Sequence, residues 1–363
     1  MHISLSLVRT LAANLVRARI ARRTFVPPFA VAWHATNACN LRCSYCDDGR
    51  GRRYPDLGGR VMTTAEVKQV LSLAREAVSV LYVTGGEPLL RNDLAEIIAW
   101  AKRDARFGFV GLATNGTMLH RQESILEHVD EIEISLDSLD DEEYDSMLNA
   151  GAGTSRTIAN AVLRYHALAP EHRYQLSVTC VAMPGRIRHA SDVVRFCFER
   201  GIPCGVLPQS TGPYPEAGLR NDPDYVRFID DVVAAKRRGA PAYGSYSYYS
   251  HIRDFRAFQC YPTLVPRIFP NGDLFYPCSP RGTVAGNLVG ARSFKKTLAE
   301  GLRRHGPVPS CDPRCFASCY IETSNAINAP LAMLRERVQF ARHARPARVM
   351  PRLAGFPPAD LEA

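Results

Sequence analysis

The sequence predicts an α/β protein whose main part is a partial (βα)6 barrel. Between residues 29 and 210, six strand-like apolar runs alternate with five helix-like runs. The spacing is roughly 25–45 residues per strand–helix unit, as βαβ crossovers require. Six such units are too few to close an eight-stranded barrel. Because the carboxyl ends of parallel strands share one edge, we expect the functional loops to follow the strands.

The individual elements follow from local periodicity. The expected strands cover residues 29–35, 78–86, 109–116, 131–138, 174–182 and 203–209. The expected helices cover residues 64–77, 92–105, 121–129, 155–168 and 190–201. Pro- and Gly-rich sequence after residue 210 indicates a connection.

The chain is therefore divided into a barrel, a smaller C-terminal domain and flanking segments. The expected units are a basic amphipathic helix (1–28), the barrel (29–210), a connecting segment (211–258), a small cysteine-containing domain (259–330) and a basic tail (331–363).

Composition limits the class of protein. The 363 residues are 46% hydrophobic and 22% charged, which suits a folded chain of one large or two modest domains. No apolar run reaches the roughly 18 residues that a membrane span needs. The 11 cysteines are mostly clustered, which favours metal binding in a reducing, cytoplasmic compartment over a disulfide framework.

Positive charge is concentrated at the two ends. Residues 1–28 contain five arginines and no acid, and residues 335–352 contain six arginines and one glutamate, against a total charge of +9. A nearly neutral body argues against a nucleic-acid partner. The N-terminal helix has two interpretations: it packs on the protein's own body, or it lies peripherally on an anionic inner membrane surface.

Three cysteines follow the first expected strand. Cys39, Cys43 and Cys46 have the spacing C-x3-C-x2-C and lie at the predicted functional edge. A structural zinc site would need a fourth ligand. A 4Fe–4S cluster bonds one thiolate per iron, so three cysteines leave one iron open for another ligand.

This motif resembles that of the radical S-adenosylmethionine (radical SAM) superfamily, and the resemblance covers roughly residues 29–210. The aromatic Tyr45 before the last cysteine belongs to the same pattern. The resemblance implies that S-adenosylmethionine (SAM) binds the open iron and is cleaved reductively to a 5′-deoxyadenosyl radical. It also implies a reducing partner such as flavodoxin or ferredoxin.

Further motifs at the strand ends support the resemblance. The second strand ends in a GGEP sequence, the third in ATNG and the fourth in SLD, where the family contacts SAM. Glu87 would face the methionine ammonium group, and the paired glycines would allow close backbone approach. The implied SAM contacts are Tyr45, Gly85, Gly86, Glu87, Pro88, Asn115, Ser135 and Asp137.

A second cysteine group resembles the SPASM and Twitch extensions of radical SAM enzymes. It comprises Cys260, Cys278, Cys311, Cys315 and Cys319. The resemblance implies one auxiliary 4Fe–4S cluster, held by Cys260, Cys278, Cys319 and one of the other two. The full SPASM pattern has more cysteines, and a structural zinc stays an alternative. An Asn271-Gly272 turn would form a hairpin that brings Cys260 and Cys278 together.

Two remaining cysteines lie on expected barrel strands. Cys180 and Cys204 would ordinarily be small buried hydrophobes. If their thiols faced into the barrel, they would be candidate hydrogen-atom donors to a substrate radical.

The reaction has three interpretations. The first is a radical SAM oxidoreductase or transferase-type enzyme that abstracts hydrogen from a small-molecule or lipid-linked substrate, for oxidation, epimerisation or C–C bond formation. The second is a peptide maturase that installs a crosslink or oxidation. The third is a non-catalytic iron–sulfur redox or scaffold protein. Because only a short segment precedes the first strand, we expect a small or lipid-linked substrate rather than a peptide.

Overall fold

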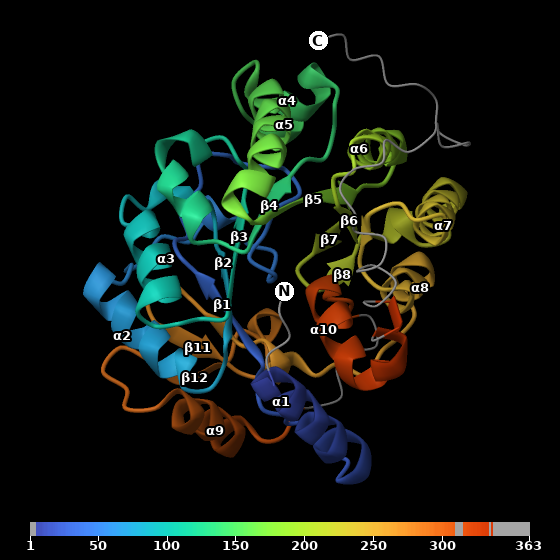
Figure 1. The fold of residues 1–363 in the computed structure, drawn as a ribbon. Coiled ribbons are helices and arrows are strands. Elements are labelled where there is room, and N and C mark those ends of the chain that lie inside the picture. The colour runs from blue at the N-terminus through green and yellow to red at the C-terminus, as the bar shows by residue number, and fades with distance from the viewer. Residues whose placement is uncertain (1–4, 309–314, 334, 337–363) are drawn as a thin grey trace.

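The computed structural model describes residues 5–308, 315–333 and 335–336. Six parallel strands form its centre in the order in which they occur along the chain (Figure 1). These are β1 (Ala30–His34), β2 (Val80–Thr84), β3 (Phe109–Thr114), β4 (Glu131–Ser135), β5 (Gln175–Ala182) and β6 (Cys204–Pro208). This arrangement confirms the predicted α/β class and partial barrel.

Helices cover the outer face of this sheet (Figure 1). They are α2 (Thr64–Arg75), α3 (Leu94–Arg103), α4 (Asp141–Leu148), α5 (Thr154–His172), α6 (Ile187–Glu199) and α7 (Pro223–Arg237). A capping box explains where α2 begins, because the Thr63 hydroxyl accepts from the Glu66 amide and the Glu66 carboxylate accepts from the Thr63 amide.

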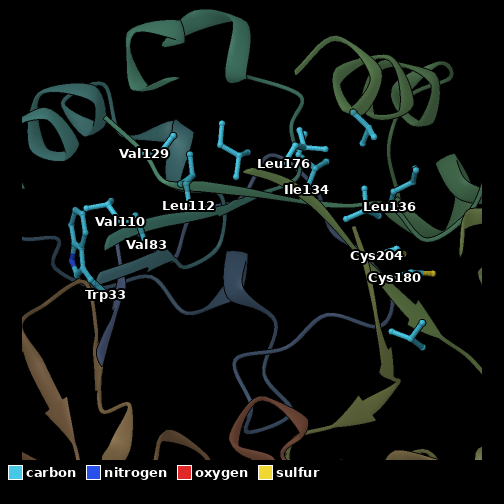
Figure 2. Close-up of a cluster of buried hydrophobic side chains, with 14 of the residues drawn as sticks. Trp33, Val83, Val110, Leu112, Val129, Ile134, Leu136, Leu176, Cys180 and Cys204 are labelled. Carbon is cyan, nitrogen blue, oxygen red and sulfur yellow. The ribbon is translucent and has the colours of Figure 1, made fainter. Parts of the chain in front are cut away.

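Strand alternation separates the core from the barrel interior. Trp33, Val83 and Leu112 face the helices in the hydrophobic layer of Figure 2 and are at most 1% exposed. Their chain neighbours point to the opposite, inward face, as the period of two requires. Near the start of the strands, Ala30, Val80 and Phe109 form a separate apolar cluster on that inward face.

Two local predictions differ from the structure. Residues 121–129, expected to be a helix, form two short 3-10 segments at Leu119–Arg121 and Glu123–Glu127. Helix α4 was not predicted, because it is short and its acidic first turn leaves little apolar periodicity in the sequence. Its N-cap is Asp140, whose carboxylate accepts from the Glu143 amide, and its buried residues include Tyr144 and Leu148.

The C-terminal region extends the barrel sheet. A parallel pair joins β10 (Arg267–Ile268) to β1, with Arg267 opposite Ala32. The predicted Asn271-Gly272 hairpin is present between β10 and β11 (Asp273–Phe275). The remaining elements are β7 (Ser210–Thr211), β8 (Tyr214–Pro215), β9 (Ala242–Tyr243), α8 (Tyr246–Asp254), β12 (Val284–Asn287), α9 (Phe294–His305) and α10 (Ser318–Asn328).

The N-terminal helix packs on the protein's own body. Helix α1 (Leu5–Leu15) continues into a π-helical turn, Val16–Ile20, and contacts α10. The Arg19 guanidinium donates to the carbonyl oxygens of Ile327 and Asn328, while Ala18 is buried. Val16 and Ile20 stay exposed. In the described part of the chain, no helix has the length and apolarity to cross a bilayer.

We expect removal of residues 1–24 to lower the midpoint of thermal unfolding. The deletion takes away Ala18 from a buried cluster with Val26, Leu264 and Ile327, and it breaks the Arg19 contacts. Losing one buried apolar side chain and these hydrogen bonds should cost about 2–4 kcal/mol. Thermal melts of both forms measure this, and sedimentation with anionic vesicles tests the alternative. A truncated protein of unchanged stability that loses vesicle binding would contradict the packed interpretation.

Candidate functional site

The loop after β1 brings the first three cysteines together. Cys39 and Cys43 are half-buried and Cys46 is more exposed. Burial is the main cause that raises the pKa of each thiol, and for Cys46, whose pKa rises to about 12, the nearby Cys39 adds to the effect. Close thiols that resist ionisation become thiolates when a cationic centre binds them.

The donor set fits a cluster better than a single metal ion. Among the described residues, no three His, Cys, Asp or Glu side chains are grouped as ligands of one metal ion. A 4Fe–4S cluster bonds each thiolate to a different iron, so its ligands stand farther apart than those of one ion. The side-chain oxygen of Asn37, beside this loop, is also buried, and no described residue donates a hydrogen bond to it.

The GGEP segment holds the cysteine loop through its backbone. The Gly86 amide donates to the Thr36 carbonyl, and the Glu87 amide donates to the Ala38 carbonyl, each at 2.8 Å. A Cβ on Gly86 would lie 2.3 Å from the Ala38 carbonyl oxygen. Gly85 has a φ of +140°, a backbone conformation that residues with a side chain rarely adopt. The two glycines therefore allow the end of β2 to lie close to the backbone of the protein's own cysteine loop.

Glu87 connects the ends of two strands. It is fully buried, and its carboxylate accepts from the Thr114 hydroxyl at 2.8 Å and from the Asn115 and Leu89 amides at 2.8 and 3.0 Å. Burial raises the pKa of Glu87, although these three donors oppose the shift. The sequence indicated a ligand contact for Glu87 but not this bracing of β2 against β3.

We expect Glu87→Gln to weaken SAM binding without loss of iron from the cysteine loop. The amide removes a charge-assisted acceptor and turns an NH2 group toward backbone donors, at a cost of about 1.5–3 kcal/mol. Iron analysis and equilibrium binding of SAM, compared with the exposed Glu76→Gln variant, measure the effect. Wild-type affinity in Glu87→Gln would show that the segment is only a turn.

Tyr45 and Asp137 join the cysteine loop to β4 and β5. The Tyr45 hydroxyl donates to the Asp137 carboxylate, which also accepts from the Val181 amide at 2.6 Å. Burial raises the pKa of Asp137 to about 6, against the opposing effect of these donors. Asp137 thus positions Tyr45, whereas Ser135 is exposed at the end of β4 and can contact a ligand.

Asn115 belongs to a second polar link to the loop. Its amide nitrogen donates to the Asn40 side chain and its oxygen accepts from the Thr117 hydroxyl, at 2.9 and 2.6 Å. Asn40 in turn donates to Thr117 at 2.9 Å. Thr117 was not singled out in the sequence, although it directly follows the ATNG motif. Pro88 is buried and begins the turn after Glu87.

Cys180 and Cys204 face the helices instead of the barrel interior. Both are 0% exposed and lie in the hydrophobic layer of Figure 2, and Cys204 interacts with Cys197 of α6. They share strand parity with Val178 and Val206, whose side chains are also buried in that layer. The condition for hydrogen-atom donation is not met, and we correct that prediction to a packing role.

The inward face of β4 carries two carboxylates that the sequence analysis missed. Glu131 accepts from the Ser177 hydroxyl at 3.0 Å and is 7% exposed. Burial, and then the neighbouring Glu133, raises the pKa of Glu131 to about 7. The alternation in EIEIS, residues 131–135, was the available signal, since Ile132 and Ile134 occupy the core positions.

We expect Glu131 to make folding stability depend on pH. Its folded pKa lies above the unfolded value, so its contribution is present below pH ~4.5 and is lost as pH rises through ~7. Relative to Glu131→Gln, the wild type should lose up to about 3 kcal/mol over that interval. Anaerobic urea unfolding of both proteins at pH 5 and 7.5 measures this difference. An equal difference at the two pH values would contradict the buried-carboxyl assignment.

The second cysteine group is only partly within the described residues. Cys278 is buried after β11, Cys260 and Cys315 are half-buried, and Cys319 is exposed at the start of α10. Cys311 lies outside the described residues. The Arg267 guanidinium donates to the Cys319 sulfur at 3.0 Å. A cationic donor at a thiol suits a metal-bound thiolate, which fits a cluster or a zinc ion in this region.

Curated relatives match about half of the chain. The chain is 31% identical over 207 residues to "GTP 3',8-cyclase 2" of Mycobacterium tuberculosis, covering 56% of this chain and 55% of the relative. It is 36% identical over 172 residues to "Probable GTP 3',8-cyclase" of Methanococcus maripaludis, covering 46% and 54%. The chain therefore spans about half the length of these curated relatives.

Solved structures share the fold at low identity. The structure titled "Native anSMEcpe with bound AdoMet" aligns with TM-score 0.57 and 16% identity, covering 87% of this chain and 97% of the other. "Crystal structure of Streptococcus suis SuiB bound to precursor peptide SuiA" aligns with TM-score 0.53 and 16% identity, covering 76% and 66%. Residues 33–197 match the family model "Radical SAM superfamily", whose members use SAM and a 4Fe–4S cluster. Residues 33–197, which contain the cysteine loop, therefore resemble the radical SAM superfamily in sequence, and the fold agrees with that of the solved structures.

Proposed function

We propose that this protein reductively cleaves SAM to methionine and a 5′-deoxyadenosyl radical, which abstracts a hydrogen atom from an unactivated C–H bond of a small-molecule or lipid-linked substrate. Cys39, Cys43 and Cys46 would hold the SAM-binding cluster, which supplies the electron. Residues 259–330 would carry an auxiliary cluster on Cys260, Cys278, Cys319 and one of Cys311 or Cys315.

One observation carries the proposal: three strand-end motifs are bonded to one cysteine loop. Glu87 and Gly86 join it through the backbone, Asp137 joins it through Tyr45, and Asn115 joins it through Asn40. Motifs that served only as turns would not need these hydrogen bonds to the cysteine loop. Their combined effect is to preorganise the loop, so that little reorganisation is required when SAM binds.

The chain's own residues would orient SAM and limit access of water. Ser135 offers an exposed hydroxyl at the end of β4, and the Asn37 side-chain oxygen offers a buried acceptor. Gly85 and Gly86 allow the backbone before Cys39 to pack closely against the end of β2. A flavodoxin or ferredoxin would deliver the reducing equivalent to the exposed edge near Cys46.

The relatives named GTP 3',8-cyclase make GTP a second candidate substrate. Glu131 and Glu133 lie on the inward face of β4, and burial raises the pKa of both carboxyls. Glu131 begins the strand, away from the strand ends that meet the cysteine loop. These two groups therefore do not decide between GTP and another small molecule. A peptide substrate, as in a maturase, stays the alternative.

The test is deuterium transfer into 5′-deoxyadenosine. Anaerobically reconstituted protein is supplied with SAM, a reductant and deuterium-labelled GTP, candidate small molecules, lipid-linked sugars or peptides. Mass spectrometry then identifies the substrate whose deuterium reaches the nucleoside. No 5′-deoxyadenosine above background with any reductant would favour a non-catalytic redox or scaffold protein.

A lipid-linked substrate would be supported by peripheral membrane contact at the cytoplasmic face. Val16, Ile20 and Arg17 are exposed together on the turn after α1, a pattern that permits shallow insertion. Anionic vesicles should then recruit the protein at low salt, and neutral vesicles should not. Absence of recruitment would favour a water-soluble substrate.

A further inference from the structure

Arg267 lies between the two cysteine segments. It is on β10, the strand that pairs with β1, and its guanidinium spans two contacts. One NH2 group donates to the Cys319 sulfur at 3.0 Å, and the other lies 3.3 Å from Nε2 of His34 on β1. Because these contacts use separate nitrogens, the planar group is held by both elements at once.

His34 fixes the orientation of this guanidinium. Burial, followed by the nearby arginine charges, lowers the pKa of His34 well below its ordinary value, so the ring is neutral. Since Arg267 can only donate, Nε2 accepts, and Nδ1 carries the proton toward the Tyr54 hydroxyl at 3.1 Å. Phe269 stacks on the His34 ring with centroids 4.4 Å apart.

Arg267 also interacts with Tyr320, the residue after Cys319. Tyr320 is 3% exposed, and its hydroxyl interacts with the Arg267 and Ser279 side chains. The Arg267 guanidinium carbon lies 5.6 Å from the Tyr320 ring centroid, and Tyr320 is near enough to interact electrostatically with Cys278 and Cys319. Tyr320 therefore helps to hold the Arg267 guanidinium beside Cys319, together with His34.

The opposite end of the network reaches the SAM-binding loop. Tyr54 belongs to the segment after Cys46 and lies within electrostatic range of that thiol. The same segment packs on the second cysteine region, since Arg50 lies over the Phe275 ring, 5.1 Å from its centroid. The order Cys46, Tyr54, His34, Arg267, Cys319 therefore spans both proposed cluster sites.

We propose that Arg267 is a positioning residue that sets the reduction potential of the auxiliary cluster through its contact with Cys319. The inference rests on the proposed auxiliary cluster. A cationic donor at a ligand sulfur stabilises the more negative, reduced state and so raises the potential. His34 keeps the guanidinium in place without competing as a charge.

The test uses full-length protein in which Cys39, Cys43 and Cys46 are all alanine, so that only the auxiliary cluster contributes. In this background we compare Arg267→Met, Arg267→Lys and the surface control Arg256→Met. Redox titration followed by electron paramagnetic resonance gives the potential, and iron analysis gives cluster content. We expect a lower potential in Arg267→Met, partial recovery in Arg267→Lys and no change in Arg256→Met.

Each outcome separates the inference from the function on which it rests. Zinc or no metal in the triple-alanine protein would refute the auxiliary cluster itself. A cluster whose potential is the same in Arg267→Met would refute the role of Arg267 alone. If Arg267→Met loses iron, the redox titration of Arg267→Lys decides. A reduction potential shifted from that of the parent protein supports the proposal. An unshifted potential, or loss of iron from both variants, overturns it.

Discussion

Alanine at Cys39, Cys43 or Cys46 is expected to abolish formation of 5′-deoxyadenosine. Each thiol would bond one iron of the SAM-binding cluster, so a single substitution leaves two protein ligands and removes stable cluster binding. The loss should exceed a hundredfold and reach the background of the assay, because metal-ligand loss removes the reactive centre as well as a contact. Anaerobic incubation with SAM and dithionite, followed by chromatography of the nucleoside, measures it.

A matched control comes from the same loop. Ser44 is exposed, and within the described part of the chain its backbone amide donates to the Met147 carbonyl while its side chain makes no hydrogen bond. Ser44→Ala should therefore keep wild-type nucleoside formation and iron content. Each cysteine variant should retain the iron of the C-terminal region. Full activity in a triple-alanine protein would end the assignment of the loop as the SAM-binding site.

Periodicity was sufficient to predict the barrel because each unit is local. The six strands and most covering helices are encoded by apolar spacing within about ten residues, as for β5, where Leu176, Val178 and Cys180 face one way. That same parity could have excluded Cys180 as an inward-facing donor. The period of two was used to find the strand but not to assign its faces.

Contacts between distant segments could not be predicted in this way. The pairing of β10 with β1 joins residues more than 200 positions apart, and nothing in a two-residue strand specifies its neighbour. The contact between Arg267 and Cys319 depends on that pairing. Glu87 likewise was assigned a ligand from its motif, whereas two of its three internal donors, on Thr114 and Asn115, come from the end of the next strand.

Gly86→Ala is expected to disrupt SAM binding although it adds a single methyl group. The new Cβ would lie 2.3 Å from the Ala38 carbonyl oxygen and 2.6 Å from that of Asn37. Both obstacles are backbone atoms directly before Cys39, so the cysteine loop has to move. Overpacking of this kind costs about 1–3 kcal/mol, which corresponds to a loss of about 5- to 140-fold in affinity if the displaced loop is the binding surface.

The control for this substitution is Gly151→Ala. A Cβ there meets no atom within 4 Å, so stability and SAM affinity should stay at wild-type values. SAM affinity, iron content and the urea midpoint of unfolding are measured for both variants. Because Gly86 donates its amide to Thr36 and the next residue donates to Ala38, a shift of this strand end moves the loop as a unit. Wild-type SAM affinity in Gly86→Ala would mean that SAM does not bind where the GGEP segment meets the cysteine loop.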